Sequence, residues 1–335
     1  MFVRDDPNAT YKLLKPEFEK RGYSTTEESD GDHRYFLFHS PAGKIWRSRV
    51  ARIGYPFTSL AAKNMFNHKE DAYTFAQSHG VNIPFTRYVA ADEEVSQSEA
   101  QSLLDKYGTL IVKPSNSTLS RGLTLNITSI EALGDAITYA RQIKKGVLIQ
   151  EQIDGEEIRF IVLKGKVKGA LLRQTARVIG DGHSTIAELI KAENEVRKTL
   201  IFPLISYPQL SNLIVDSSFF TDETILAEGE VRELNRATMI KNGSSVYNVL
   251  KNVHPSYIEI VENMVADVDT KFMAVDLFLK DYTQPKNNRN YWFIEFNTSP
   301  VLKLCYGCRD GKMFDIVPLL VEVIDEHLHQ ADNPA

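Results

Sequence analysis

The feature that most limits how this chain can fold is a carboxylate inside an otherwise apolar strand. Residues 272 to 279 read FMAVDLFL and residues 291 to 296 read YWFIEF, with the polar loop DYTQPKNNRN between them. Short apolar runs separated by turn residues predict two strands of an antiparallel hairpin. Because burying an unpaired carboxylate is costly, Asp276 requires a partner within the fold.

Two further polar residues end the second predicted strand. Glu295 and Asn297 are two positions apart, so their side chains share one face, and antiparallel pairing can bring them to the face of Asp276. Two carboxylates and an amide oxygen form a hard, oxygen-only site, which suits magnesium shared with phosphates. We therefore expect Asp276, Glu295 and Asn297 to hold Mg2+. The alternative is an exposed hairpin whose polar residues face water.

A magnesium phosphate ligand also requires cationic side chains nearby. Neither GxxxxGK[ST] nor GxGxxG occurs in the chain, which disfavours a P-loop and a Rossmann dinucleotide site. Lys113 instead ends the strand TLIVKP before the polar turn SNSTLSRG, and Lys69 begins a predicted helix. A strand-end lysine can neutralise phosphate while backbone N–H groups of the turn cover it. Taken alone, the position of each lysine favours a solvated side chain over a phosphate contact.

Composition excludes several classes of protein. The chain has 335 residues, 43% of them hydrophobic and 25% charged, with a formal net charge of -5, so nucleic acid is not an expected partner. We find no signal-peptide pattern and no run near the roughly 20 apolar residues of a membrane span, and we expect a cytoplasmic protein without a membrane partner. Cys305 and Cys308 are the two cysteines, which favours a packed thiol pair over a metal or redox site.

Changes in hydrophobic patterning divide the chain into three predicted units. They are an N-terminal α/β lobe over residues 1 to 66, a central lid subdomain over 67 to 155 and a C-terminal subdomain over 156 to 335. The first combines a helix over 10 to 21 with strands at 34 to 38 and 44 to 47. In the third, Thr185 and Glu188 have capping-box spacing. Mixed helices and strands of this kind predict an α+β fold of two or three lobes.

The order of these motifs resembles the ATP-grasp ligases. A lysine precedes a helix that ends in G-V-x-I-P, VKP precedes a polar loop, an apolar strand ends in E, and G-x-E and D…ExN follow. The resemblance covers most of the chain, from Lys69 to the C-terminal helix. Two segments, EEIRFIVLKGKV and LLRQTARVIGDGHSTIAELI, resemble cyanophycin synthetases and bifunctional glutathione synthetases more specifically. The resemblance implies an ATP-grasp fold, in which the nucleotide is held between two α+β lobes.

The resemblance also implies a role for each motif residue. It places Lys69 and Lys113 at the ATP phosphates, Glu151 at the adenine edge, Glu157 at the ribose hydroxyls, Asp276, Glu295 and Asn297 at Mg2+, and Arg159, Arg173 and Arg236 at the acyl phosphate and the acceptor. Two Mg2+ ions are implied, with Mn2+ as a substitute, and the turn SNSTLSRG becomes a lid. For Arg159 the alternative is a cross-strand surface pair.

The activity that follows is that of a carboxylate-amine ligase, which uses ATP to join small amino-acid or peptide substrates through an acyl phosphate. A small-molecule kinase and a non-catalytic nucleotide-binding module are the alternatives, and a homodimer is the implied assembly. The chain departs from the subgroup pattern R-x-N-x-x-x-G-G plus an acid, with Thr238, Asn242 and Tyr247 at the altered positions. The large partner domains of the two named enzymes are also missing from these residues, so we expect neither cyanophycin polymerisation nor complete glutathione synthesis.

Overall fold

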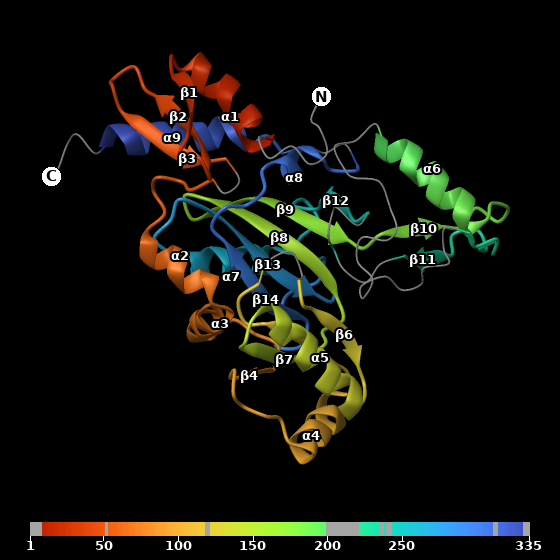
Figure 1. The fold of residues 1–335 in the computed structure, drawn as a ribbon. Coiled ribbons are helices and arrows are strands. Elements are labelled where there is room, and N and C mark those ends of the chain that lie inside the picture. The colour runs from red at the N-terminus through yellow and green to blue at the C-terminus, as the bar shows by residue number, and fades with distance from the viewer. Residues whose placement is uncertain are drawn as a thin grey trace.

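A computed structural model provides the fold (Figure 1). It describes residues 9–50, 53–117, 121–198, 221–234, 238, 243–310 and 314–330. Within these ranges the strands form sheets of three, four and five strands and a small two-stranded sheet. In Figure 1 the three-stranded sheet lies above the five-stranded sheet and the four-stranded sheet lies below it. The mixture of helices with antiparallel sheets confirms the predicted α+β class.

The N-terminal lobe consists of a three-stranded antiparallel sheet and two helices from opposite ends of the chain. Its elements are α1 (Ala9–Lys20), β1 (Ser24–Ser29), β2 (Arg34–His39), β3 (Ile45–Arg49) and α9 (Val317–Gln330). The helix α9 packs beside α1, so the C-terminal part of the chain completes this lobe. The sequence did not predict β1, because its residues STTEES are polar and mostly exposed and show no apolar alternation.

The four-stranded sheet is covered by helices on one face. Its strands, in the order β4-β7-β5-β6, are β4 (Thr86–Val89), β5 (Leu110–Pro114), β6 (Thr124–Ile127) and β7 (Val147–Glu151). The covering helices are α4 (Gln97–Tyr107) and α5 (Ile130–Ile143), which begin at the serine N-caps Ser96 and Ser129. Val112 and Ile149 join the core beneath these helices. Since strand residues alternate, Lys113 and Gln150 lie on the opposite face.

The five-stranded antiparallel sheet is buried on both faces. Its strands, in the order β12-β9-β8-β13-β14, are β8 (Glu156–Leu163), β9 (Lys166–Gln174), β12 (Ser245–Asn248), β13 (Phe272–Leu279) and β14 (Tyr291–Asn297). On one face lies the α3/α7 core, which comprises Ala72, Tyr73, Tyr257, Phe293 and their buried neighbours. The helices that contribute to it are α2 (Leu60–Asn67), α3 (Lys69–Ser78) and α7 (Pro255–Val265).

Alternation along β13 decides where its carboxylate points. Met273, Val275 and Leu277 enter the α3/α7 core, whereas Phe272 and Ala274 enter the core shared with the N-terminal lobe. Asp276 continues the second series, so it lies on the face of the N-terminal lobe but beyond that lobe's apolar contacts. The same face therefore changes from apolar to charged along the length of the strand.

A β-bulge in β14 aligns the second acidic residue with the first. Asp276 pairs with Glu295, but the next residue, Leu277, pairs with Phe293, so Ile294 is the extra residue. Phe293 and Phe296 are three positions apart and would face opposite sides of a regular strand, yet both belong to the α3/α7 core. The bulge thus places Glu295 on the face that carries Asp276.

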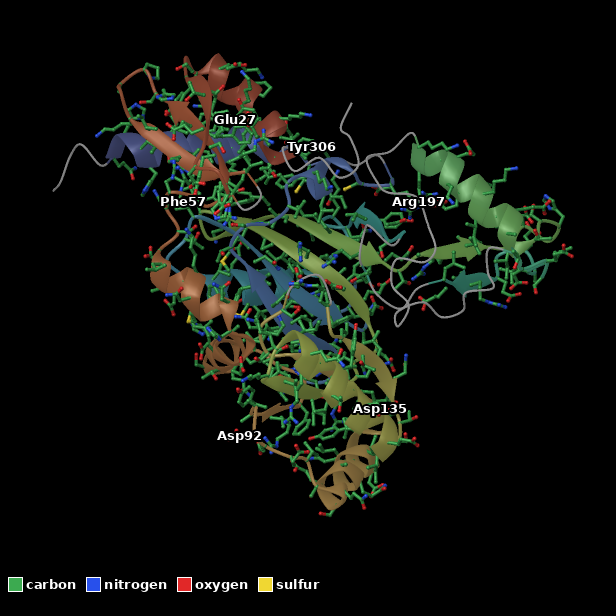
Figure 2. All side chains as sticks on the ribbon, in the orientation of Figure 1. Glu27, Phe57, Asp92, Asp135, Arg197 and Tyr306 are labelled. Carbon is green, nitrogen blue, oxygen red and sulfur yellow. The ribbon has the colours of Figure 1, made fainter. Side chains whose placement is uncertain are left out.

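The remaining elements form a small unit beside the five-stranded sheet. They are β10 (Arg177–Ile179), α6 (Ile186–Lys198) and β11 (Val231–Glu233), and a short helix, α8 (Lys303–Tyr306), precedes α9. Arg197, labelled in Figure 2, is 1% exposed and donates a 2.8 Å hydrogen bond to Ser245 Oγ of β12. This contact ties α6 to the edge of the five-stranded sheet.

Several sequence predictions change in detail. The helix expected from 256 ends at Val265 instead of 271, since Val268 turns back into the core before β13 begins. The helix expected over 67 to 79 is interrupted at His68, which is extended with φ -106° and ψ 118°, so Lys69 is the first residue of α3. Cys305 and Cys308 are buried and unbridged, as predicted. Within the described residues no helix has the length and apolar character needed to cross a bilayer.

The capping box predicted at Thr185 is present and gives a test of α6. Thr185 N donates to Glu188 Oε2 at 2.9 Å, and Glu188 N donates to Thr185 Oγ1 at 3.2 Å. We expect Thr185→Ala to destabilise α6 by about 1 kcal/mol and to accelerate hydrogen exchange of its first-turn amides. Thr138→Ala is the control, because that hydroxyl only bonds the Gly134 carbonyl within α5. Equal effects of both substitutions on α6 exchange would contradict the capping role.

Candidate functional site

Charged side chains from four adjacent strands lie in register across the five-stranded sheet. Arg159 of β8 pairs with Asp276 of β13, and Asp276 pairs with Glu295 of β14. Two residues before Arg159, Glu157 of β8 pairs with Arg173 of β9. Antiparallel partners on one face have neighbouring side chains, so these five residues form one continuous group, called here the charged row.

The centre of the charged row is a buried ion pair. Arg159 Nε donates to Asp276 Oδ1 at 2.7 Å and Arg159 Nη2 donates to Oδ2 at 2.6 Å, a bidentate arrangement. Asp276 is 0% exposed and Arg159 is 7% exposed. Burial raises the pKa of Asp276 to about 6 although Arg159 acts in the opposite direction, so the carboxylate is ionised at neutral pH. Burial would lower the pKa of Arg159, but Asp276 outweighs this and raises it.

This pair settles two alternatives left open by the sequence. Asp276 does not face water, so the exposed-hairpin interpretation is wrong for this residue. The sequence argument that Asp276 needs a partner is confirmed, but the partner in the structure is Arg159, where we had expected the metal. Arg159 does pair across strands, yet the pair is buried and not on the surface. The partner was unpredictable because register cannot be read from one strand alone.

Glu295 lies at the open end of the charged row. Its side chain is 35% exposed, and its Oε2 is 3.7 Å from Lys69 Nζ at the start of α3. Arg159 Nη2 lies 3.6 Å from its Oε1. Burial would raise the pKa of Glu295, but Lys69 and Arg159 outweigh it and hold the pKa at about 2. The carboxylate is therefore ionised at any ordinary pH.

The expected metal ligands lie together, and their chemistry fits Mg2+. Asn297 Nδ2 is 3.2 Å from Glu295 Oε1 and 3.5 Å from Asp276 Oδ2, so the amide borders both carboxylates. Rotating this amide would turn its oxygen toward the same place, since the two ends of an asparagine amide are interchangeable in shape. Within the described residues no cluster of three or more His, Cys, Asp or Glu side chains could hold a metal. The oxygen donors present suit an ion that completes its shell with water and phosphate.

Glu157 and Arg173 form the other end of the charged row. Glu157 is 8% exposed and accepts hydrogen bonds from Arg173 Nη1 and from the Thr238 hydroxyl. Arg173 Nη2 donates to the Thr238 carbonyl at 2.8 Å, and its Nη1 is 3.6 Å from Asp276 Oδ2. Thr238, a departure from the subgroup pattern, thus contacts both charged residues. The third expected arginine, Arg236, lies outside the described residues.

The two expected phosphate lysines both lie near one tyrosine. Tyr73 is one helical turn after Lys69 in α3, and its hydroxyl accepts a 2.9 Å hydrogen bond from Lys113 Nζ. Burial lowers the pKa of Lys113 to about 8, while Glu295 raises it. The structure therefore brings Lys69, Lys113 and Glu295 into one neighbourhood, although they come from a helix and two different sheets.

Glu151 is the last residue of β7. Its Oε1 accepts a 2.8 Å hydrogen bond from the backbone N–H of Phe85, next to β4. Its side chain therefore secures the chain entering β4, and the adenine role implied by the resemblance remains a prediction. Tyr73 and Gln150 were missed in the sequence analysis. For Gln150 a signal was present, because it is a polar residue at the end of the apolar run VLIQ, the same kind of signal that identified Asp276.

Comparison with known proteins identifies curated relatives of this chain. No protein-family model matches the chain. The glutathione biosynthesis bifunctional protein GshAB of Streptococcus agalactiae is 29% identical over 223 residues, covering 63% of this chain and 30% of the relative. Cyanophycin synthetase of Crocosphaera subtropica is 24% identical over 289 residues, covering 84% of this chain and 33% of the relative. The chain spans about a third of the length of these curated relatives.

Solved structures of ligases with a similar fold are also found. A bifunctional glutathione synthetase from Pasteurella multocida superposes with a TM-score of 0.67 at 20% identity, covering 95% of this chain and 44% of that one. D-alanine--D-alanine ligase from Bacillus anthracis gives a TM-score of 0.51 at 14% identity, covering 82% of this chain and 71% of that one. The chain therefore has the ATP-grasp fold and resembles, over most of its length, part of the bifunctional glutathione biosynthesis proteins and cyanophycin synthetases.

Proposed function

We propose that the chain is an ATP-dependent carboxylate-amine ligase, which joins small amino-acid or peptide substrates through an acyl phosphate and releases ADP and phosphate. The observation that carries the proposal is the meeting of Asp276, Glu295 and Asn297 with Lys69 and Lys113. Such a group offers oxygen ligands for a cation and two ammonium groups for phosphates in one place. The curated relatives, named for glutathione biosynthesis and cyanophycin synthesis, support this reaction class.

The proposed reaction has two steps. A carboxylate oxygen of the first substrate attacks the γ-phosphorus of ATP, and ADP leaves, which yields an acyl phosphate. The amine nitrogen of the second substrate then attacks the acyl carbon, phosphate leaves, and the nitrogen loses a proton to give the amide. Both reactants of the first step are anions, so charge neutralisation and positioning are the main catalytic requirements. No nucleophilic side chain is needed.

The side chains of this chain divide that work by their positions. Lys69 and Lys113 would bind phosphate oxygens, and Asp276, Glu295 and Asn297 would together hold Mg2+. When bound, the metal would supply charge neutralisation for the phosphate groups. We propose that two Mg2+ ions bind here and that Mn2+ can substitute for Mg2+. Closure over the site would exclude water, which otherwise hydrolyses an acyl phosphate.

Arg159 and Arg173 differ in their freedom to reach a substrate. Both Arg159 nitrogens on the Asp276 side are engaged in the bidentate pair, so we propose that Arg159 mainly fixes Asp276. Arg173 is bound to Glu157 and Thr238, while its Nε is buried and has no hydrogen-bond partner among the described residues. A donor left unsatisfied in this way favours Arg173 as the arginine that contacts the reacting groups.

The activity test is an assay of ADP and phosphate release from ATP and Mg2+ across amino acids and short peptides, singly and in pairs, with product masses measured. We expect release that requires a pair and a condensed product. Glu295→Gln should lower kcat/KM by at least about 100-fold, because it removes the exposed anionic ligand of the site. Glu27→Gln, an exposed change in the N-terminal lobe, is the control.

Other outcomes of this assay would contradict the ligase. A stable phosphorylated product formed from one compound without an amine would assign a small-molecule kinase. ATP binding without turnover across the panel would favour a nucleotide-binding module. Equal activity of wild type and Glu295→Gln would show that Glu295 is not part of the site.

A second prediction separates the structural role of Arg159 from catalysis. Arg159→Met leaves Asp276 buried without its partner and should lower the free energy of unfolding by about 3–5 kcal/mol. The double variant Arg159→Met/Asp276→Leu replaces the pair by apolar groups and should recover most of that loss while remaining inactive. Chemical denaturation measures both. A single variant within about 1 kcal/mol of wild type would contradict the structural role.

A further inference from the structure

Lys113 is a partly buried cation whose ammonium group is hydrogen-bonded to a neutral side chain. Its ammonium donates to Tyr73 OH at 2.9 Å, and burial lowers its pKa. Across the described part of the chain, no carboxylate lies within 4.0 Å of Lys113 Nζ, and Glu295 acts on it only at longer range. A long, flexible side chain without an ion-pair partner needs another contact to fix its orientation.

Tyr73 is well suited to provide that contact. It is 3% exposed, and its ring packs edge-on against Phe293 at a centroid distance of 5.9 Å, so the side chain has little freedom. Burial raises the pKa of Tyr73 to about 12, which keeps the hydroxyl neutral. A neutral acceptor holds the ammonium without cancelling its charge, and that charge then remains for an anionic ligand.

A chain of hydrogen bonds fixes the direction of the Tyr73 hydroxyl. Thr86 Oγ1 donates to the Pro84 carbonyl at 2.9 Å, so it must accept from Gln150 Nε2 at 2.6 Å. The amide of Gln150 therefore turns its oxygen toward Tyr73, whose hydroxyl lies 3.5 Å away and donates to it. With its proton directed at Gln150, Tyr73 presents a lone pair to Lys113. Gln150 is 1% exposed, so water does not compete for this orientation.

The helix α3 connects this chain of hydrogen bonds to the charged row. Lys69 and Tyr73 are four positions apart and lie on the same side of α3. Lys69 is 3.7 Å from Glu295 of the five-stranded sheet, while Tyr73 bonds Lys113 of the four-stranded sheet. One helix thus sets the separation of the two ammonium groups that the proposed function assigns to phosphates.

We infer that Tyr73, oriented through Gln150 and Thr86, is a positioning residue that aims the Lys113 ammonium at the nucleotide phosphates. The inference rests on the proposed function for the identity of the ligand. The contact between Lys113 and Tyr73 is observed independently of that function, so it can be tested with and without nucleotide.

The first test is a double-mutant cycle on ATP affinity, measured by calorimetry with Mg2+ present. Tyr73→Phe should weaken ATP binding by about tenfold in the wild-type background. In the Lys113→Met background the same substitution should change affinity by less than about twofold, because the group that Tyr73 positions is gone. A loss of equal size in both backgrounds would show a purely structural role and overturn the inference.

A matched substitution controls for the loss of a buried hydroxyl. Tyr257 belongs to the same α3/α7 core and is 0% exposed, and its hydroxyl lies 3.4 Å from the Asp281 carbonyl, away from Lys113. Tyr257→Phe should leave ATP affinity within about twofold of wild type. An equal weakening by Tyr73→Phe and Tyr257→Phe would contradict the inference.

The second test requires no nucleotide. The pH dependence of acetylation at Lys113, followed by peptide mass spectrometry, reports the fraction of neutral amine. Losing an acceptor destabilises the ammonium, so Tyr73→Phe should shift the labelling midpoint to lower pH, and Tyr257→Phe should not. An unchanged midpoint in Tyr73→Phe would overturn the inference. If wild type fails to bind ATP, the proposed function fails, while this labelling result still decides whether Tyr73 controls Lys113.

Discussion

The bidentate pair between Arg159 and Asp276 is the interaction on which the rest of the site depends. It lies in the middle of a sheet that is buried on both faces, where an isolated charge would be too costly to retain. A buried ion pair is weak evidence for stability, because apolar residues of similar volume often stabilise as much. Its consequence here is geometric. Asp276 is held ionised beside Glu295 and Asn297, so an oxygen-rich group can form at the end of an apolar sheet.

Two further constraints bring the other components to this group. The bulge at Ile294 lets β14 keep both Phe293 and Phe296 in the core while turning Glu295 toward Asp276. The interruption at His68 starts α3 at Lys69, so the lysine lies at the helix end nearest Glu295. Each is a local irregularity in an otherwise regular element, and each places one charged side chain. The regular parts of the fold supply the burial that makes those placements rigid.

Much of this architecture could be predicted from the sequence, for identifiable reasons. The strands FMAVDLFL and YWFIEF show clear apolar patterns, and Asp276 is conspicuous because a carboxylate interrupts one of them. What the sequence does not contain is the register between strands, so Arg159 was not recognised as the partner of Asp276. The bulge was also missed, because one extra residue leaves the composition of a strand unchanged. The polar strand β1 and the packing of α9 on α1 depend on contacts between distant segments, which periodicity cannot reveal.

The measurement that tests the central claim most directly follows oxygen through the reaction. The substrate carboxylate would be labelled with 18O, and the released phosphate would be analysed by mass spectrometry once a productive substrate pair is identified. Attack of that carboxylate on ATP predicts one labelled oxygen atom in each phosphate released with the amide. Unlabelled phosphate, with the label retained entirely in the substrate or product, would contradict an acyl phosphate and with it the ligase assigned to this site.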